Sequence, residues 1–211
     1  MDSEHITAII TGAAAILGGL AVAIFSAIQE LISNYIKRKK STAHLAVIVV
    51  PQLELFAEQC ANVAYDDGTL YGRPAGEGGA HRPTTKAPEF MPSEFSVEWT
   101  SISKKTWFSI FQLPQTKRAI DNSLNSILEF VAGPPDYKEY FWERRIRYGN
   151  LSLDASRLAM KLRADVGMED KKNNIEDIYQ KQQLHDLIER LKTERESYQK
   201  RCSELTPGPG F

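Results

Sequence analysis

The chain has 211 residues and a nearly balanced charge, with 26 Lys and Arg against 27 Asp and Glu and a net charge of −1. This balance is far from the basic surplus of a typical nucleic-acid-binding protein, so no nucleic-acid partner is expected. Two distant cysteines, Cys60 and Cys202, and four scattered histidines provide neither a disulfide framework nor metal-ligand spacing. We therefore predict no metal and no cofactor.

Residues 6–28 form an uncharged, largely apolar run of 23 residues. As a helix this run extends about 34 Å, which is enough to cross a hydrocarbon core of about 30 Å. A buried helix of a soluble protein is the alternative, but such helices rarely lack a polar face over six turns. The run predicts a single transmembrane helix, preceded by a short extracytoplasmic N-terminus at residues 1–5.

The charges on either side of this run predict its orientation. The N-terminus carries Asp2 and Glu4 but no basic residue, which argues against a cleaved signal peptide. The basic residues follow the run, within a juxtamembrane segment at residues 29–41. They are Lys37, Arg38, Lys39 and Lys40. The positive-inside rule places this cluster in the cytoplasm, where it can contact anionic headgroups. The sequence does not indicate which membrane is involved.

Small residues recur at every fourth position of the predicted membrane helix. They are Thr11, Ala15, Gly19, Ala23 and Ala27. Small side chains at this spacing let two helix backbones approach closely, so the ladder predicts a homo-oligomer or a partner membrane protein. The simpler interpretation is that Ala and Gly are frequent in membrane helices.

Residues 42–168 are predicted to form a helical cytoplasmic domain that begins with an amphipathic helix over residues 42–65. Pro51 either kinks a helix that continues from upstream or occupies the first turn of a new one. The apolar opening at residues 45–50 leaves a re-entrant or interfacial segment as an alternative. Opposite the apolar stripe lie acidic residues that indicate a solvated face or an acidic interaction surface. They are Glu54, Glu58 and Asp66. A basic surface that such a face could meet comprises Arg144, Arg145 and Arg147.

The middle of the chain changes character. Residues 67–92 are rich in Gly and Pro and predict a long loop without a nucleotide-binding ending. Residues 95–99 alternate in polarity as a short strand does, but a lone strand needs a partner and the sequence shows none. Residues 104–111 predict a short aromatic helix that packs in the core, with a seat in the membrane interface as the alternative.

Further helices are predicted over residues 114–131 and 136–148, then from Ala155 to a stop at Gly167, after an interruption at Gly149 and Asn150. Residues 169–205 predict a C-terminal amphipathic helix and residues 206–211 a disordered tail. Apolar residues repeat every seven positions in this helix, at Leu184, Leu191, Tyr198 and Leu205. The seam is a weak coiled-coil signal, and the helix either packs on its own domain or pairs between chains.

No short catalytic motif is present. The fold class predicted is mainly α, and the function is a single-pass membrane-anchored protein that acts by protein association, as a scaffold or accessory subunit. One alternative is a membrane-tethered, metal-dependent hydrolase that uses carboxylates of the helix at 42–66. Another is an oligomeric effector that perturbs the membrane. The sequence indicates no particular small-molecule ligand.

Overall fold

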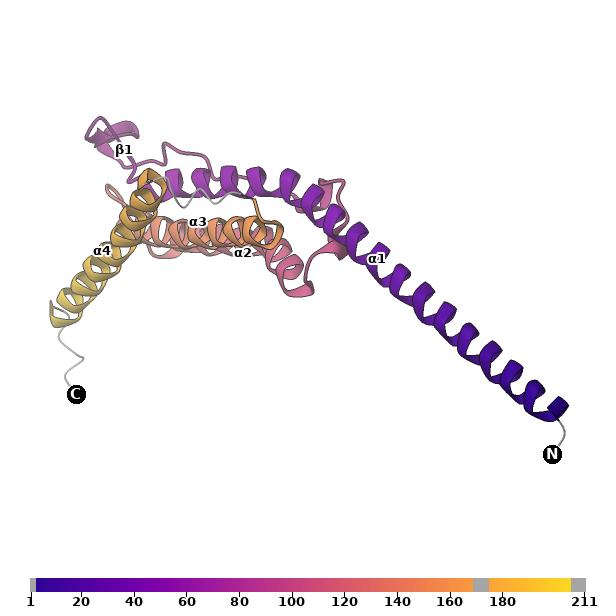
Figure 1. Cartoon of the computed structure of the whole chain (residues 1–211). Helices are drawn as coiled ribbons and strands as arrows, with labels where there is room; N and C mark the ends of the chain where they lie inside the picture. Colours follow the sequence, from indigo (N-terminus) through magenta and orange to yellow (C-terminus); the bar gives the residue numbers. More distant parts are fainter. Residues whose placement is uncertain (1–2, 169–174, 206–211) are drawn as a thin grey trace, which may run out of the picture.

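The computed structural model describes the backbone of residues 3–168 and 175–205, and the side chains of residues 25–168 and 178–204. This part of the chain is mainly helical (Figure 1). The α-helices are α1 (Ser3–Tyr65), α2 (Lys104–Phe130), α3 (Lys138–Val166) and α4 (Ile175–Leu205). Between α1 and α2 lie the short strands β1 (Thr69–Leu70) and β2 (Arg73–Pro74), followed by the 3-10 turns η1 (Glu77–Gly79), η2 (Pro92–Glu94) and η3 (Trp99–Ser101).

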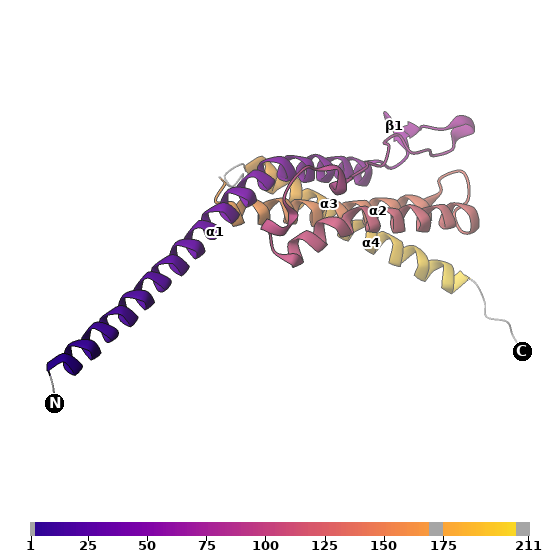
Figure 2. The ribbon, with the colours of Figure 1, turned by 90° about the vertical axis from the view of Figure 1, so that its right-hand side faces the viewer.

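Helix α1 is a single helix of 63 residues, about 95 Å long at 1.5 Å per residue. It joins the predicted membrane helix, the juxtamembrane segment and the helix at 42–65 without a break. Its N-terminal part projects away from the other helices in both views (Figures 1 and 2). Pro51 lies inside α1, so the chain follows the first of the two alternatives for this proline. Pro51 has no N–H, and the helix tolerates the loss of that one hydrogen bond.

Within the residues whose side chains the structure describes, no helix has a stretch both long and apolar enough to cross a membrane. Several predictions concern residues outside that part. The side chains of residues 6–24, which include Thr11, Ala15, Gly19 and Ala23 of the ladder, lie outside it, although their backbone is helical. The segment 169–174, the tail 206–211 and the side chain of Leu205 also lie outside the described residues. The transmembrane span therefore stays a prediction.

The core forms where α1 packs on α3, and α3 in turn contacts α2 and α4. Most of the predicted stripe of α1 is buried there, although Val47 at its edge is 60% exposed. Its fully buried members include Val49, Val50, Leu53, Cys60 and Val63. Burial raises the pKa of the Cys60 thiol, which keeps it neutral and unreactive. Helical periodicity thus predicts the covered face of α1 correctly over residues 45–64.

Helices α2 and α3 each combine two segments that the sequence predicts as separate. Pro114 lies inside α2, which begins at an N-cap where Thr106 N donates to Ser103 Oγ at 3.1 Å. Gly149 lies inside α3, and a Cβ there would be 2.9 Å from the Ile188 side chain of α4. Gly149 is thus a point of close helix approach. The end of α3 at Gly167, with φ of +67°, matches the prediction.

The segment between α1 and α2 is mostly irregular, as predicted for residues 67–92. The exception is a small antiparallel hairpin, in which β1 pairs with β2. Residues 95–99 form no strand: residues 95–98 connect the turns η2 and η3, and Trp99 begins η3. Phe90 anchors the segment to the core, with its ring 5.1 Å from that of Phe56.

Candidate interaction surfaces

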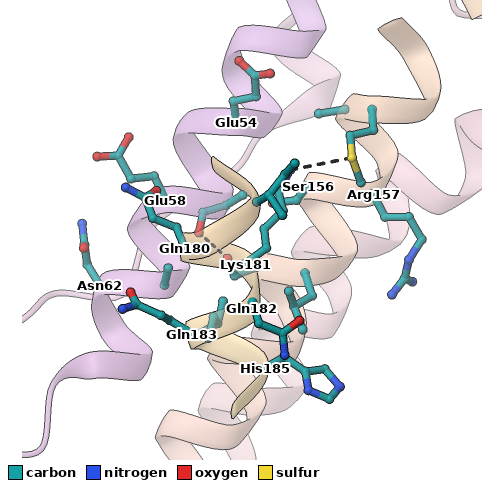
Figure 3. A pocket seen from close by; sticks show the side chains of 18 of the residues that line it. Glu54, Glu58, Asn62, Ser156, Arg157, Gln180, Lys181, Gln182, Gln183 and His185 are labelled. Atoms are coloured by element: carbon teal, nitrogen blue, oxygen red, sulfur yellow. Dashed lines mark hydrogen bonds between the residues drawn. The ribbon is translucent and has the colours of Figure 1, made fainter. Parts of the chain in front are cut away.

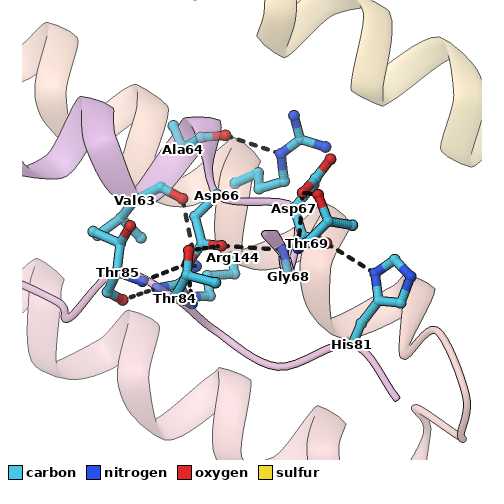
Figure 4. A network of polar contacts seen from close by, with 11 residues as sticks. Val63, Ala64, Asp66, Asp67, Gly68, Thr69, His81, Thr84, Thr85 and Arg144 are labelled. Atoms are coloured by element: carbon cyan, nitrogen blue, oxygen red, sulfur yellow. Dashed lines mark hydrogen bonds and ion pairs between the residues drawn. The ribbon is translucent and has the colours of Figure 1, made fainter. Parts of the chain in front are cut away.

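A buried ion pair fastens the end of α1 to α3. Arg144 Nη1 lies 2.8 Å from Asp66 Oδ2, and the two side chains are only 4% and 1% exposed. Asp66 also accepts hydrogen bonds from Gly68 N at 3.1 Å, from Thr84 N and Oγ1 at 2.9 and 2.8 Å, and from Thr85 N at 2.9 Å (Figure 4). The donors come from three separate segments, at Gly68, at Thr84 and Thr85, and at Arg144 of α3, so this polar knot holds the loop against the bundle. We keep that name for these five residues.

The knot keeps Asp66 ionised. Burial alone would raise the pKa of Asp66, but the hydrogen bonds from Thr85, Gly68 and Thr84 and the charge of Arg144 together lower it. A carboxylate with this many donors has no remaining capacity for a metal or substrate. Asp66 therefore lies apart from the acidic surface predicted with Glu54 and Glu58.

The basic residues of α3 do not form an open patch. Arg144 is buried, and Arg145 is partly buried and donates from Nε to the carbonyl of Ala64 at 2.9 Å. Arg147 is partly buried and pairs with Glu143 of its own helix. Between the predicted acidic and basic surfaces, the structure forms the ion pair of Asp66 with Arg144.

A groove with a volume of about 770 Å³ lies between α1, α3 and the start of α4 (Figure 3). Glu54 and Glu58 line its α1 side, and Glu54 pairs with Arg163 of α3 at 2.8 Å. Among the residues with described side chains, no group of three or more His, Cys, Asp or Glu is placed to hold a metal ion. The groove offers hydrogen bonds and apolar contacts.

The predicted coiled-coil seam begins against the chain's own bundle. Leu184 and Leu191 are buried in a cluster with Ile146 of α3 and Ala64 of α1. Tyr198 packs edge-on against Trp142 of α3, with ring centroids 5.2 Å apart. The structure thus places the described part of the seam in contact with α1 and α3.

The basic cluster marks the point where α1 leaves the bundle. Arg38 Nε and Thr42 Oγ1 both donate to the Ser101 carbonyl, at 3.2 and 3.0 Å, and Ser41 Oγ donates to Glu98 at 2.5 Å. Lys37, Lys39 and Lys40 are exposed. These bonds tie η3, and with it the start of α2, to the junction.

Residues 25–40 of α1, which we call the stalk, carry an exposed apolar face. The apolar run predicted from the sequence includes only the part of this face up to Ile28. The large residues of the face are between 47% and 69% exposed, and we call them the stalk stripe. They are Phe25, Ile28, Leu31, Ile32, Tyr35 and Ile36. Polar residues occupy the other side of the stalk, at Ser26, Gln29, Glu30, Ser33 and Asn34.

One signal in the sequence does reveal the stripe. Ile28, Leu31, Ile32 and Tyr35 stand 18 residues before the core residues Ala46, Val49, Val50 and Leu53. Eighteen residues make five turns of an α-helix, so both sets lie on one face. The stalk stripe therefore continues the face that α2 and α3 cover further along.

These features define a mainly helical protein in which one helix serves both as a wall of the core and as a projecting stalk. Comparison of the chain with models of known protein families, with curated proteins and with solved structures finds no match.

Proposed function

We propose that this chain is a single-pass membrane-anchored protein with its N-terminus outside and its helical bundle in the cytoplasm, acting as a scaffold or accessory subunit through protein association. The observation that supports this proposal best is the continuity of α1 from the apolar run into the core. A bundle on a continuous helix keeps a fixed position relative to its anchor, which suits a scaffold. A flexible linker would not give that constraint.

The charges near the junction support the same arrangement. From Ile28, the last residue of the apolar run, to Arg38 there are ten residues, or about 15 Å along the helix axis. The lysines at 37, 39 and 40 are exposed, and they would sit close to a cytoplasmic leaflet rich in anionic lipid. A cytoplasmic position of these lysines agrees with the positive-inside rule.

Anchoring and orientation can be tested together. The full chain should resist extraction from membranes by alkaline carbonate, and a reporter that is active only in the cytoplasm should work when fused after Phe211. A protein released by carbonate would contradict the anchor. An anchored protein with an inactive reporter would contradict only the orientation.

Association through the ladder has a closely matched control. Ala15→Leu with Ala23→Leu places two large side chains on the predicted helix contact, whereas Ala13→Leu with Ala21→Leu makes the same changes on another side of the helix. In detergent, light scattering should show a smaller particle for the first pair only. Equal behaviour of the two pairs would remove the ladder from the proposal.

A further inference from the structure

We propose that the part of the stalk stripe beyond Ile28 and the first turn of α2 form a second membrane contact, which seats the bundle on an anionic bilayer surface. This inference rests on the proposed membrane anchor and adds how the bundle lies once it is anchored. The surface that these residues contact is the headgroup layer of the leaflet from which α1 emerges.

The first turn of α2 has the composition of an interfacial segment. Trp107 is 37% exposed and Phe108 is 69% exposed, and Lys104 and Lys105 beside them are exposed as well. Tryptophan and lysine side by side are typical of helices that lie at the boundary between headgroups and acyl chains. On the other side of the same turns, Thr106 is buried in the fold. The bundle therefore fixes the direction in which the aromatic pair faces.

The structure holds this turn at the end of the bundle from which the stalk projects. The hydrogen bonds from Arg38 and Thr42 to Ser101 set η3 against α1, and α2 begins three residues after Ser101. Both views show the start of α2 at the stalk end of the bundle (Figures 1 and 2). Stripe and aromatic turn therefore lie at one corner of the molecule.

The amphipathic stalk indicates how the helix leaves the bilayer. Ile36 lies eight residues beyond Ile28, or about 12 Å along the axis, whereas the headgroup region of one leaflet is only about 5–8 Å thick. An upright helix would carry Tyr35 and Ile36 beyond that layer. An oblique exit lowers the apolar side into the layer and leaves Glu30 and Asn34 facing water.

Charge and packing favour the bilayer over a second copy of the chain. Exposed lysines occur in both segments of this contact, at positions 39, 104 and 105, and each one favours an anionic surface. Lys39 follows Tyr35 by one helical turn, on the side of the stripe. A parallel helix paired with the stripe would run into α2 and α3, which cover the same face of α1 from Leu45 onward. A bilayer in contact with the stripe would end where the stalk meets the bundle, so α2 and α3 would not obstruct it.

The test uses the full chain reconstituted in vesicles of phosphatidylcholine with a quarter phosphatidylserine, prepared with and without brominated acyl chains. Brominated chains quench tryptophans that touch the hydrocarbon boundary. We expect quenching in the parent protein and the loss of at least half of it in Trp107→Phe. The matched control is Trp142→Phe, because Trp142 packs against Tyr198 of α4 at another site in the bundle. This control should retain the quenching.

The charge requirement is tested in the same vesicles. Lys104→Glu with Lys105→Glu should reduce the quenching, and Lys86→Glu with Lys200→Glu, which changes two exposed lysines elsewhere, should not. Equal quenching of the parent in vesicles of phosphatidylcholine alone would overturn the role of anionic headgroups.

Flotation of the protein with the vesicles reports the anchor separately. If the protein floats but Trp107 is not quenched, the seating inference is wrong and the anchor stands. A photo-cross-linking amino acid in place of Phe108 tests for a protein at this corner. If it captures another polypeptide and Trp107 is unquenched, a protein occupies the corner and the inference is wrong. If the protein does not float, both the anchor and the inference fail.

Discussion

Helix α1 carries one apolar face through two different settings. Over residues 45–64 this face is buried by the other helices of the bundle, whereas on the stalk it is exposed. Val50 and Ile32 stand five turns apart on the same side of the helix, yet Val50 is buried and Ile32 is more than half exposed. Apolar periodicity therefore predicts which face of a helix is shielded from water, but it does not predict what shields that face.

The largest expected effect comes from breaking the polar knot at the covered end of α1. Arg144→Leu leaves the buried carboxylate of Asp66 without its counter-charge, which should lower the free energy of unfolding by about 3–5 kcal/mol. Thermal unfolding of the full chain in detergent, followed by near-ultraviolet circular dichroism, measures this loss. The control is Arg157→Leu, whose pair with Asp154 is largely exposed and should contribute less than about 1 kcal/mol. Equal losses in both variants would show that the knot does not stabilise the bundle.

A second prediction compares two positions five turns apart on α1. Leu53 is fully buried, so Leu53→Ala should cost about 2–5 kcal/mol through lost contacts and a residual cavity. Tyr35 is 69% exposed, and Tyr35→Ala should change bundle stability by less than about 0.5 kcal/mol. The same unfolding measurement in detergent tests both. A large loss for Tyr35→Ala would mean that the stalk folds as part of the bundle.

The smallest expected effect is on the loss of stability at acidic pH, to which Asp66 contributes. In the folded protein the pKa of Asp66 is lowered, so the unfolded chain binds more protons than the folded chain in the range just below the ordinary value of about 3.9. The stabilisation is fully present above that pH and is lost as the pH falls through the folded pKa. Asp66→Asn, although less stable at neutral pH, should show a flatter loss of stability on acidification. An unchanged acid dependence would contradict this assignment.

The features predicted correctly are those that depend on residues close together in the sequence. The buried stripe of residues 42–65 and the stop at Gly167 follow from helical spacing and from glycine's access to positive φ. The interruption expected at Gly149 is wrong for a long-range reason: the missing Cβ makes room for Ile188, a residue of another helix. Nothing near Gly149 in the sequence distinguishes a packing glycine from a breaking one.

The polar knot shows the same limit for the candidate sites. Counting Asp66 with Glu54 and Glu58 assumes that the helix continues, but α1 ends at Tyr65, so Asp66 turns inward. Its partners come from a loop at Thr84 and Thr85 and from Arg144 of α3. Such long-range contacts leave no spacing signal, whereas the stalk stripe could have been found from its 18-residue offset to the core.

The most direct test of the central claim compares the accessibility of Val50, Ile32 and Asn34 in the membrane-bound protein. Each is replaced singly by cysteine in a Cys202→Ser background, since Cys202 is exposed and Cys60 is buried, and labelled with a water-soluble maleimide. We predict that Val50→Cys is protected in vesicles and in detergent below its unfolding transition, that Ile32→Cys is protected in anionic vesicles, and that Asn34→Cys is labelled rapidly. Labelling of Ile32→Cys in the vesicles as fast as Asn34→Cys would contradict a covered stalk face.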